Sequence, residues 1–273
     1  MLYEEKTIET IPVGPLGLIP LKSCTELGAK VNDYLVDWRR ERESEHKSTI
    51  AFSGYQRESY IIGASTPRFG TGEAKGTLSE SVRGDDLYIM VDVCNYSLTY
   101  SLCGMTNHMS PDDHFQDLKR IIAAAAGKAR RINVIMPFLY ESRQHKRSSR
   151  ESLDCALALQ ELTNMGVENI ITFDAHDPRV QNAIPLKGFE TVQPIYQFIK
   201  YLLREEKELQ IDSDHMMVIS RMRAVWAALY TLPTYWDLIW GCSISAVTIH
   251  RLSMAAIRSW LTSSWEAAWK EKM

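Results

Sequence analysis

A short stretch of the chain, Asp174-Ala175-His176-Asp177, places a histidine between two acids directly after an apolar run. A lone histidine is more often structural than a metal ligand. Flanked by carboxylates in a loop, His176 could instead hold a divalent ion, directly or through water. An enzyme that uses a nucleotide needs Mg²⁺ to neutralise the phosphate charge. The stretch therefore indicates a site for a divalent ion such as Mg²⁺, with Asp174, His176 and Asp177 as its candidate ligands.

A second cluster holds four cations within eight residues, namely Arg143, Lys146, Arg147 and Arg150. A basic loop of this kind is often merely solvated. This loop follows another apolar run, and it contains Arg143 and Gln144, whose side chains can donate directed hydrogen bonds to phosphate and base. These features favour recognition of a triphosphate.

Both clusters need a scaffold, and the chain alternates between strand-like and helix-like segments. Continuous apolar runs predict strands buried on both faces at residues 48–52, 87–93, 132–138, 169–173 and 216–220. Residues 111–129 and 150–166 carry apolar side chains at helical spacing. Pro111 and two aspartates favour the start of the first helix, and Gly166 favours the end of the second. The pattern predicts an α/β fold, a parallel sheet with helices on both faces.

The two clusters follow the predicted strands that end at Phe138 and Phe173. Loops at the carboxyl ends of parallel strands meet at one edge of the sheet, where helix N-termini also converge. We therefore expect the basic loop and the Asp174–Asp177 loop to lie side by side at this edge.

Composition and charge restrict the classes of function. The chain has 273 residues, 45% hydrophobic and 24% charged, which fits a globular protein of one large domain or two modest ones. A formal net charge of −3 gives no general reason to bind nucleic acid or an anionic membrane. No apolar window approaches the roughly 18 residues of a membrane span, and the acidic N-terminus does not read as a secretory signal. Five cysteines without a CxxC pair fit reduced thiols, so the sequence predicts a cytoplasmic protein.

Four motifs occur in order along the chain: RFGTGE, SESVRGDD, YESRQHKRSSRES and IITFDAHDPRVQ. Together they resemble the ribose-phosphate diphosphokinase family, also called phosphoribosyl-pyrophosphate synthetases, from about Ile50 to Ser220. The resemblance implies a phosphoribosyltransferase-like N-terminal domain at residues 48–200 and the start of a second, incomplete domain at 201–220. Residues 1–47 carry none of the motifs and are interpreted as an N-terminal extension.

The resemblance implies an activity and a set of site residues. The family transfers the diphosphate of MgATP to ribose 5-phosphate, which gives phosphoribosyl pyrophosphate and AMP, and its subunits form homo-oligomers. By resemblance, Phe69 and Glu73 belong to a loop that reaches the adenine of a neighbouring subunit's ATP. Arg143 and Gln144 would contact the nucleotide. His176 would bind the catalytic Mg²⁺, with Asp174 beside it.

This chain departs from the family pattern at four positions within these motifs. Thr71 stands where the family usually has an aspartate, and His145 stands where an aspartate normally follows Arg-Gln. Ala175 and Asp177 replace the usual leucine and small residue around the histidine. These changes put the nucleotide contacts in doubt more than the fold.

Residues 221–273 do not continue the family pattern, which should bring a Pro-Asp phosphate loop, a catalytic loop with Lys and Arg, and an acidic loop for ribose 5-phosphate. Six of the seven tryptophans but only three of the 34 acidic residues lie in this tail. Codons that the genetic code permits for residues 220–224 encode Pro-Asp-Glu-Gly when they are read one base out of frame. The same shift yields two further family-like motifs later in the tail. We interpret the tail as an out-of-frame translation with no sheet to join. A natural amphipathic tail is the alternative.

Three hypotheses compete for the function. The first is a ribose-phosphate diphosphokinase by descent whose chain holds half of the active site and is inactive. The second is a non-catalytic nucleotide-binding or regulatory subunit that associates with an intact synthetase. The third is a different nucleotide-binding α/β enzyme with a similar strand-end site, which the intact motifs disfavour. No catalytic residue is assigned from the motifs present.

Overall fold

The computed structural model describes residues 12–44, 56–205, 217–220 and 239–242. These residues fall into two compact units, residues 1–192 and 193–273. The first unit contains β1 (Leu16–Pro20), the short 3-10 helix η1 (Lys22–Cys24), α1 (Thr25–Ser44), β2 (Ala64–Ser65), β3 (Thr77–Leu78), β4 (Asp86–Met90), β5 (Thr99–Leu102), β6 (Met105–His108), α2 (Pro111–Ala125), β7 (Arg131–Met136), α3 (Asp154–Asn164), β8 (Val167–Phe173), the 3-10 helix η3 (Pro178–Ala183) and β9 (Gly188–Val192). The second contains α4 (Ile195–Glu205), β10 (Met217–Ser220) and β11 (Ile239–Cys242).

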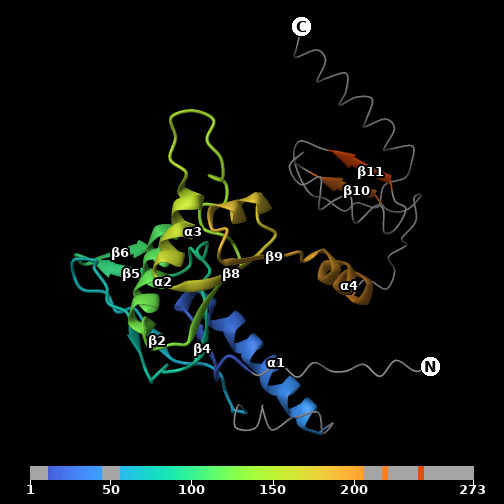
Figure 1. The fold of residues 1–273 in the computed structure, drawn as a ribbon. Coiled ribbons are helices and arrows are strands. Elements are labelled where there is room, and N and C mark those ends of the chain that lie inside the picture. Colours follow the sequence, from blue (N-terminus) through green and yellow to red (C-terminus); the bar gives the residue numbers. More distant parts are fainter. Residues whose placement is uncertain (1–11, 45–55, 206–216, 221–238, 243–273) are drawn as a thin grey trace. The chain divides into compact units, whose positions relative to one another are not determined.

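The first unit is built on a five-stranded sheet of order β1-β4-β7-β8-β9, in which every pair of neighbours is parallel (Figure 1). Side chains of β4 alternate between its two faces, as the pleat of a strand requires. Leu87 and Ile89 join the larger core with α2 and α3, whereas Met90 packs in a second core with Val36 of α1. Helices therefore cover both faces, and the predicted α/β class is confirmed.

Capping residues explain where α2 begins and where α3 ends. Ser110 caps α2: its hydroxyl accepts from the backbone N–H of Asp113, and the Asp113 carboxylate accepts from the backbone N–H of Ser110. Pro111 follows at the first helical position. After α3, Gly166 takes a positive φ of 97°, which a residue with a side chain rarely adopts. These boundaries agree with the predicted helix start and helix stop.

A polar ladder crosses the sheet between β4, β7 and β8. The side-chain amide of Asn133, which is 1% exposed, donates to the Asp86 carboxylate at 2.9 Å and to the Leu87 carbonyl at 2.9 Å. Asn169 donates to the Asn133 side-chain oxygen at 2.6 Å, and Arg131 pairs with Asp86 from the same strand as Asn133. Because a register slip would break these bonds together, the ladder fixes the register of the three strands relative to one another.

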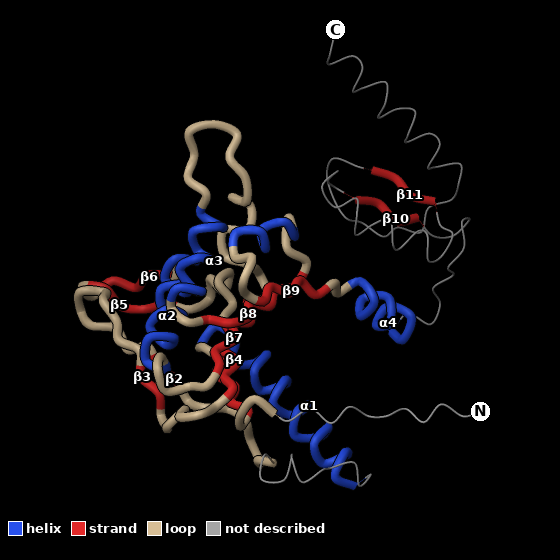
Figure 2. Tube along the Cα trace, in the orientation of Figure 1, coloured by secondary structure: helices blue, strands red, loops and turns tan. Residues whose placement is uncertain are grey.

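Two short antiparallel pairs lie outside the main sheet, and Figure 2 shows them in red beside α2. Strands β2 and β3 pair beside α2, and β5 and β6 form a hairpin. The β5–β6 hairpin lies between β4 and α2 in the chain, and it contacts the loop that precedes β3 through a bond from the Cys103 N–H to the Gly70 carbonyl.

The predicted boundary at residue 47 is wrong for residues 16–44. β1 pairs with β4 through all five of its residues, and α1 covers one face of the sheet, so both belong to the same unit as the later strands. The first unit also ends at residue 192 rather than 200. The strand predicted at residues 48–52 lies outside the described residues.

The second unit is described only in part. β10 pairs in parallel with β11, so Ile239–Cys242 of the tail does join a sheet, against the expectation. The remainder of the tail, and with it the prediction of an out-of-frame translation, lies outside the described residues. Within the described parts of the chain, no helix is long and apolar enough to cross a membrane.

Candidate functional site at the carboxyl edge of the sheet

The loops that follow β7 and β8 are tied together where the strands end. The backbone N–H of Phe173 donates to the Pro137 carbonyl at 3.3 Å. One residue later, the N–H of Asp174 donates to the Val192 carbonyl at 3.0 Å, which joins the same edge to β9. The N–H of Ala175 donates to the Thr191 hydroxyl at 2.9 Å. The predicted convergence of the two loops is therefore present.

Asp174 and His176 lie on a tight turn that exposes both side chains. Asp174 takes a positive φ of 43°, a conformation that aspartate tolerates better than most residues. Ala175 between them is buried, and its backbone N–H bonds to Thr191 of β9. The turn thus presents the Asp174 carboxylate and the His176 imidazole outward from one short segment.

His145 of the basic loop lies against His176. The two imidazole rings make an edge contact, with their centroids 5.1 Å apart. His145 Nε2 lies 3.4 Å from Asp177 Oδ2, and each of these two side chains is 12% exposed. The Nδ1 atom of His145 is buried without a hydrogen-bond partner. Hydrogen bonds from Arg179 hold the pKa of Asp177 below its usual range, and His145 acts in the same direction.

The two nucleotide-binding candidates of the basic loop, Arg143 and Gln144, differ in whether their side chains are free to bind a ligand. Arg143 is exposed and faces the loop after β4, where its charge opposes the rise in the pKa of Cys94 that burial produces. Gln144 is engaged within its own loop, because its amide donates to the Ser152 carbonyl at 2.7 Å. Arg143 can therefore bind an anion as it stands, whereas Gln144 would have to exchange its partner.

The donor set at this edge fits a metal ion that a ligand brings with it. Among the described residues, no group of three or more His, Cys, Asp or Glu side chains is gathered that could hold a metal ion alone. Asp174 and His176 offer two ligands from one exposed turn. Mg²⁺ in nucleotide sites is commonly held by one or two protein groups, with phosphates and water completing the shell. The two residues therefore fit Mg²⁺ bound to a nucleotide, but not a closed protein cage.

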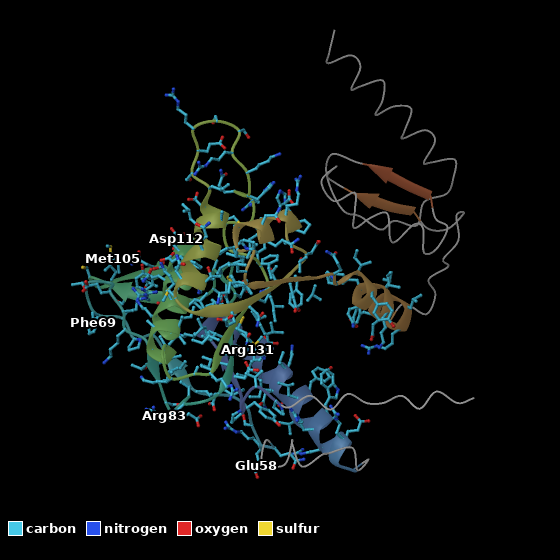
Figure 3. All side chains as sticks on the ribbon, in the orientation of Figure 1. Glu58, Phe69, Arg83, Met105, Asp112 and Arg131 are labelled. Carbon is cyan, nitrogen blue, oxygen red and sulfur yellow. The ribbon has the colours of Figure 1, made fainter. Side chains whose placement is uncertain are left out.

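Phe69 and Glu73 lie on a different loop, at residues 67–75, and do not join this edge. The backbone N–H of Phe69 donates to the Glu73 carbonyl at 2.7 Å, which closes the loop into a narrow turn. Phe69 is 53% exposed, and in Figure 3 it lies well away from the loop that connects β7 to α3. Phe69 and Glu73 thus lie apart from the other candidate residues, as expected, and their service to a neighbouring subunit stays a prediction.

Sequence reasoning missed two features of this region. His145 and Asp177 were noted as departures from a pattern, but nothing in their spacing of 32 residues indicated that they touch. A cavity of about 250 Å³ was also missed. Lys22, Thr66, Tyr100 and Asp117 are among the residues that line it, whereas none of the candidate site residues does. Its walls come from four segments that are distant in sequence, so no local motif could reveal it.

Comparison with known proteins identifies the relatives of the first unit. The family model described as the N-terminal domain of ribose phosphate pyrophosphokinase matches residues 16–166, more than half of the 273 residues. The match begins at β1, which agrees with the place of β1 in the sheet.

Curated relatives are similar over the same region. Ribose-phosphate pyrophosphokinase B of Dictyostelium discoideum is 28% identical over 155 residues, which cover 55% of this chain and 42% of that protein. Ribose-phosphate pyrophosphokinase of Buchnera aphidicola is 26% identical over 169 residues, covering 61% of this chain and 50% of the relative. The chain thus matches half or less of the length of these relatives.

A solved structure, the phosphoribosylpyrophosphate synthetase of Mycobacterium smegmatis, has a similar fold. The TM-score is 0.61 at 17% sequence identity, over 86% of this chain and 66% of that chain. At this identity the likeness concerns the fold alone.

Proposed function

Because this chain belongs to the family of ribose phosphate pyrophosphokinase N-terminal domains, we propose that it binds ATP with Mg²⁺ at the carboxyl edge of the five-stranded sheet. The observation that carries the proposal is the meeting of the two strand-end loops, in which the ring of His145 contacts that of His176. This contact brings the basic loop beside the Asp174–Asp177 turn, which supports one shared site for the proposed phosphate-binding and metal-binding groups.

Each proposed role follows from the chemistry of the side chain. Arg143 is an exposed guanidinium, whose planar donors match phosphate oxygens. Asp174 and His176 would hold Mg²⁺, which neutralises phosphate charge when the nucleotide is bound. Phe69 and Glu73 are proposed to contact the adenine in the site of a neighbouring copy, so the functional form would be a homo-oligomer.

The reaction proposed for the whole family is transfer of diphosphate from ATP to ribose 5-phosphate. We propose that this chain carries the nucleotide half of the site and is inactive on its own. The tail lacks the motifs expected to orient the acceptor sugar, and correct orientation can contribute an effective molarity of about 10⁵ M or more. Phosphoryl-type transfer depends mainly on such positioning, together with stabilisation of charge. A chain that holds only the nucleotide would also suit the second candidate function, a non-catalytic subunit of an intact synthetase.

Nucleotide binding is tested by calorimetric titration of the full-length chain with ATP, with and without Mg²⁺. Replacing His176 or Arg143 by alanine should weaken Mg²⁺-dependent binding by roughly tenfold or more, since a lost metal ligand or phosphate clamp has effects of this size. Arg83→Ala, which removes another exposed arginine, is the matched control and should bind as the unaltered chain does. Absence of Mg²⁺-dependent ATP binding in the unaltered chain would sink the proposal.

Turnover is tested separately, by following AMP formation with MgATP and ribose 5-phosphate. We expect none above background from this chain, and measurable turnover from a gene in which the reading frame after Ser220 is shifted back by one base. Equal turnover by both proteins would show that the tail supplies a working acceptor site. A change in the turnover of an intact synthetase on mixing with this chain, relative to that synthetase alone, would favour the second candidate function.

A further inference from the structure

We propose that Arg68 is a positioning residue, which fastens the 67–75 loop to α2 and to the β5–β6 hairpin. In this arrangement Phe69 and Glu73 are held ready for the nucleotide before it binds. The purpose assigned to the loop rests on the proposed function, whereas the fastening itself rests on contacts within this chain.

The first anchor of Arg68 is a pair of aspartates on α2. Its Nη2 atom lies 3.2 Å from Asp117 Oδ2 and 3.6 Å from Asp113 Oδ1. The side chains of Arg68 and Asp117 are only 10% and 8% exposed, so water screens their attraction weakly. The Thr66 hydroxyl also donates to Asp117 Oδ2 at 3.0 Å, which fixes the residue that leads into the loop.

The second anchor is the β5–β6 hairpin. The guanidinium carbon of Arg68 lies 4.5 Å from the centre of the Tyr100 ring, a cation–π arrangement. The backbone N–H of Cys103, at the tip of the hairpin, donates to the Gly70 carbonyl at 3.2 Å. Arg68 Nη1 also donates to the Gly72 carbonyl at 3.3 Å. One guanidinium thus joins α2, the hairpin and the far side of its own loop.

These contacts support a positioning role better than a role in the stability of the core. Asp117 has a second cation, Arg120, whose Nη1 lies 2.6 Å from Asp117 Oδ1, so α2 keeps a charge partner without Arg68. The loop itself is mostly exposed, and exposed loops are usually mobile unless they are held. Ordering a loop before binding lowers the entropy lost when the ligand arrives. A buried anchor beneath exposed Phe69 and Glu73 has this effect.

The test uses hydrogen-exchange mass spectrometry on the full-length chain, with Arg68→Ala, Arg68→Lys and the control Arg83→Ala. We expect Arg68→Ala to speed exchange roughly tenfold or more in the peptides that contain the amides of Phe69, Gly72 and Cys103, because charge-assisted bonds that close the loop are lost. Exchange in β4 and β7 should stay unchanged. Lysine keeps the charge but not the fork or the stacking, so Arg68→Lys should give a smaller increase.

The hairpin anchor is tested with Tyr100. Tyr100→Phe keeps the ring beneath Arg68 and should leave exchange of the loop unchanged, whereas Tyr100→Leu should speed it. Equal effects of phenylalanine and leucine would overturn the contribution of the ring. Unchanged exchange of the 67–75 loop in Arg68→Ala would overturn the whole proposal.

A parallel titration with MgATP separates the fastening from its purpose. Weaker ATP binding by Arg68→Ala than by Arg83→Ala, together with faster exchange of the loop, supports the positioning role. Faster exchange with undiminished ATP affinity overturns that role. If the unaltered chain binds no MgATP while Arg68→Ala still loosens the loop, the fastening stands and the proposed function fails.

Discussion

Replacing Asn133 by leucine should destabilise the first unit by about 3 kcal/mol. The side chain is of similar size, so the change removes hydrogen bonds and creates little cavity. It deletes one bond to the Asp86 carboxylate and leaves the Leu87 carbonyl and the Asn169 amide without this partner. A bond to a charged group contributes about 1.5–3 kcal/mol, and each buried group left unpaired costs about 1–3 kcal/mol. Asn169 is half-buried and regains some solvation, which keeps the sum near the lower end.

The assay is native-state hydrogen exchange of the peptides that contain β4 and β7, because it reports on this unit separately from the second one. Each 1.4 kcal/mol is tenfold in an equilibrium constant, so exchange through global opening should become more than about a hundredfold faster. Asn182→Leu, at an exposed position, is the control and should change stability by less than about 0.5 kcal/mol. A loss below about 1 kcal/mol for Asn133→Leu would show that the ladder does not hold the strands in register.

Two further changes test an ion pair at the site and the packing of β3 against α2. Arg179 lowers the pKa of Asp177 in the folded chain, so the stabilisation from this carboxylate is present above its unfolded pKa of about 3.9 and is lost as the pH falls towards the lower folded value. Asp177→Asn should therefore flatten the pH dependence of thermal unfolding below about pH 4, and an unaltered slope would refute the assignment. Gly76→Ala would place a Cβ 2.5 Å from the Arg120 carbonyl oxygen, so β3 and α2 must separate, at a cost of about 1–3 kcal/mol. A melting temperature equal to that of the unaltered chain would contradict this.

The parts of the fold that sequence predicts are those that are apolar on both faces. β4, β7 and β8 were found because buried parallel strands appear as continuous apolar runs. β1 was missed because Gly17 and Pro20 interrupt a run of five residues, a pattern more typical of a loop. β9 was missed because it is a sheet edge of half-buried and exposed residues, in which the apolar residues Phe189 and Val192 flank the polar pair Glu190 and Thr191. α1 was missed because its outer face carries the exposed aromatic residues Tyr34 and Trp38, which blur the apolar stripe.

For the candidate site, sequence predicts which loops meet but not which side chains touch. Adjacent parallel strands end at the same edge of the sheet, so the loops that follow them meet there whatever residues the loops contain. The meeting of the basic loop with the Asp174–Asp177 turn could therefore be expected. The inward turn of Gln144 towards Ser152 depends on the path of a loop of ten or more residues. The contact between Arg68 and Tyr100 depends on where the β5–β6 hairpin packs, and strand propensity does not reveal that. Such contacts are set by tertiary packing, and only the folded chain displays them.

The contact between His145 and Asp177 changes the meaning of two departures from the family pattern. Judged singly, each one weakens the likeness of a motif. In the structure the two residues face each other at 3.4 Å, one from each strand-end loop. An aspartate at position 145, as the family pattern has it, would bring a second carboxylate close to Asp177, and like charges at short range disfavour each other's ionised form. With histidine at 145 this repulsion is absent, and Asp177 keeps its bonds to Arg179. The two departures therefore meet at one contact, and we expect that His145→Asp would disfavour the ionised form of Asp177 unless Asp177 is replaced as well.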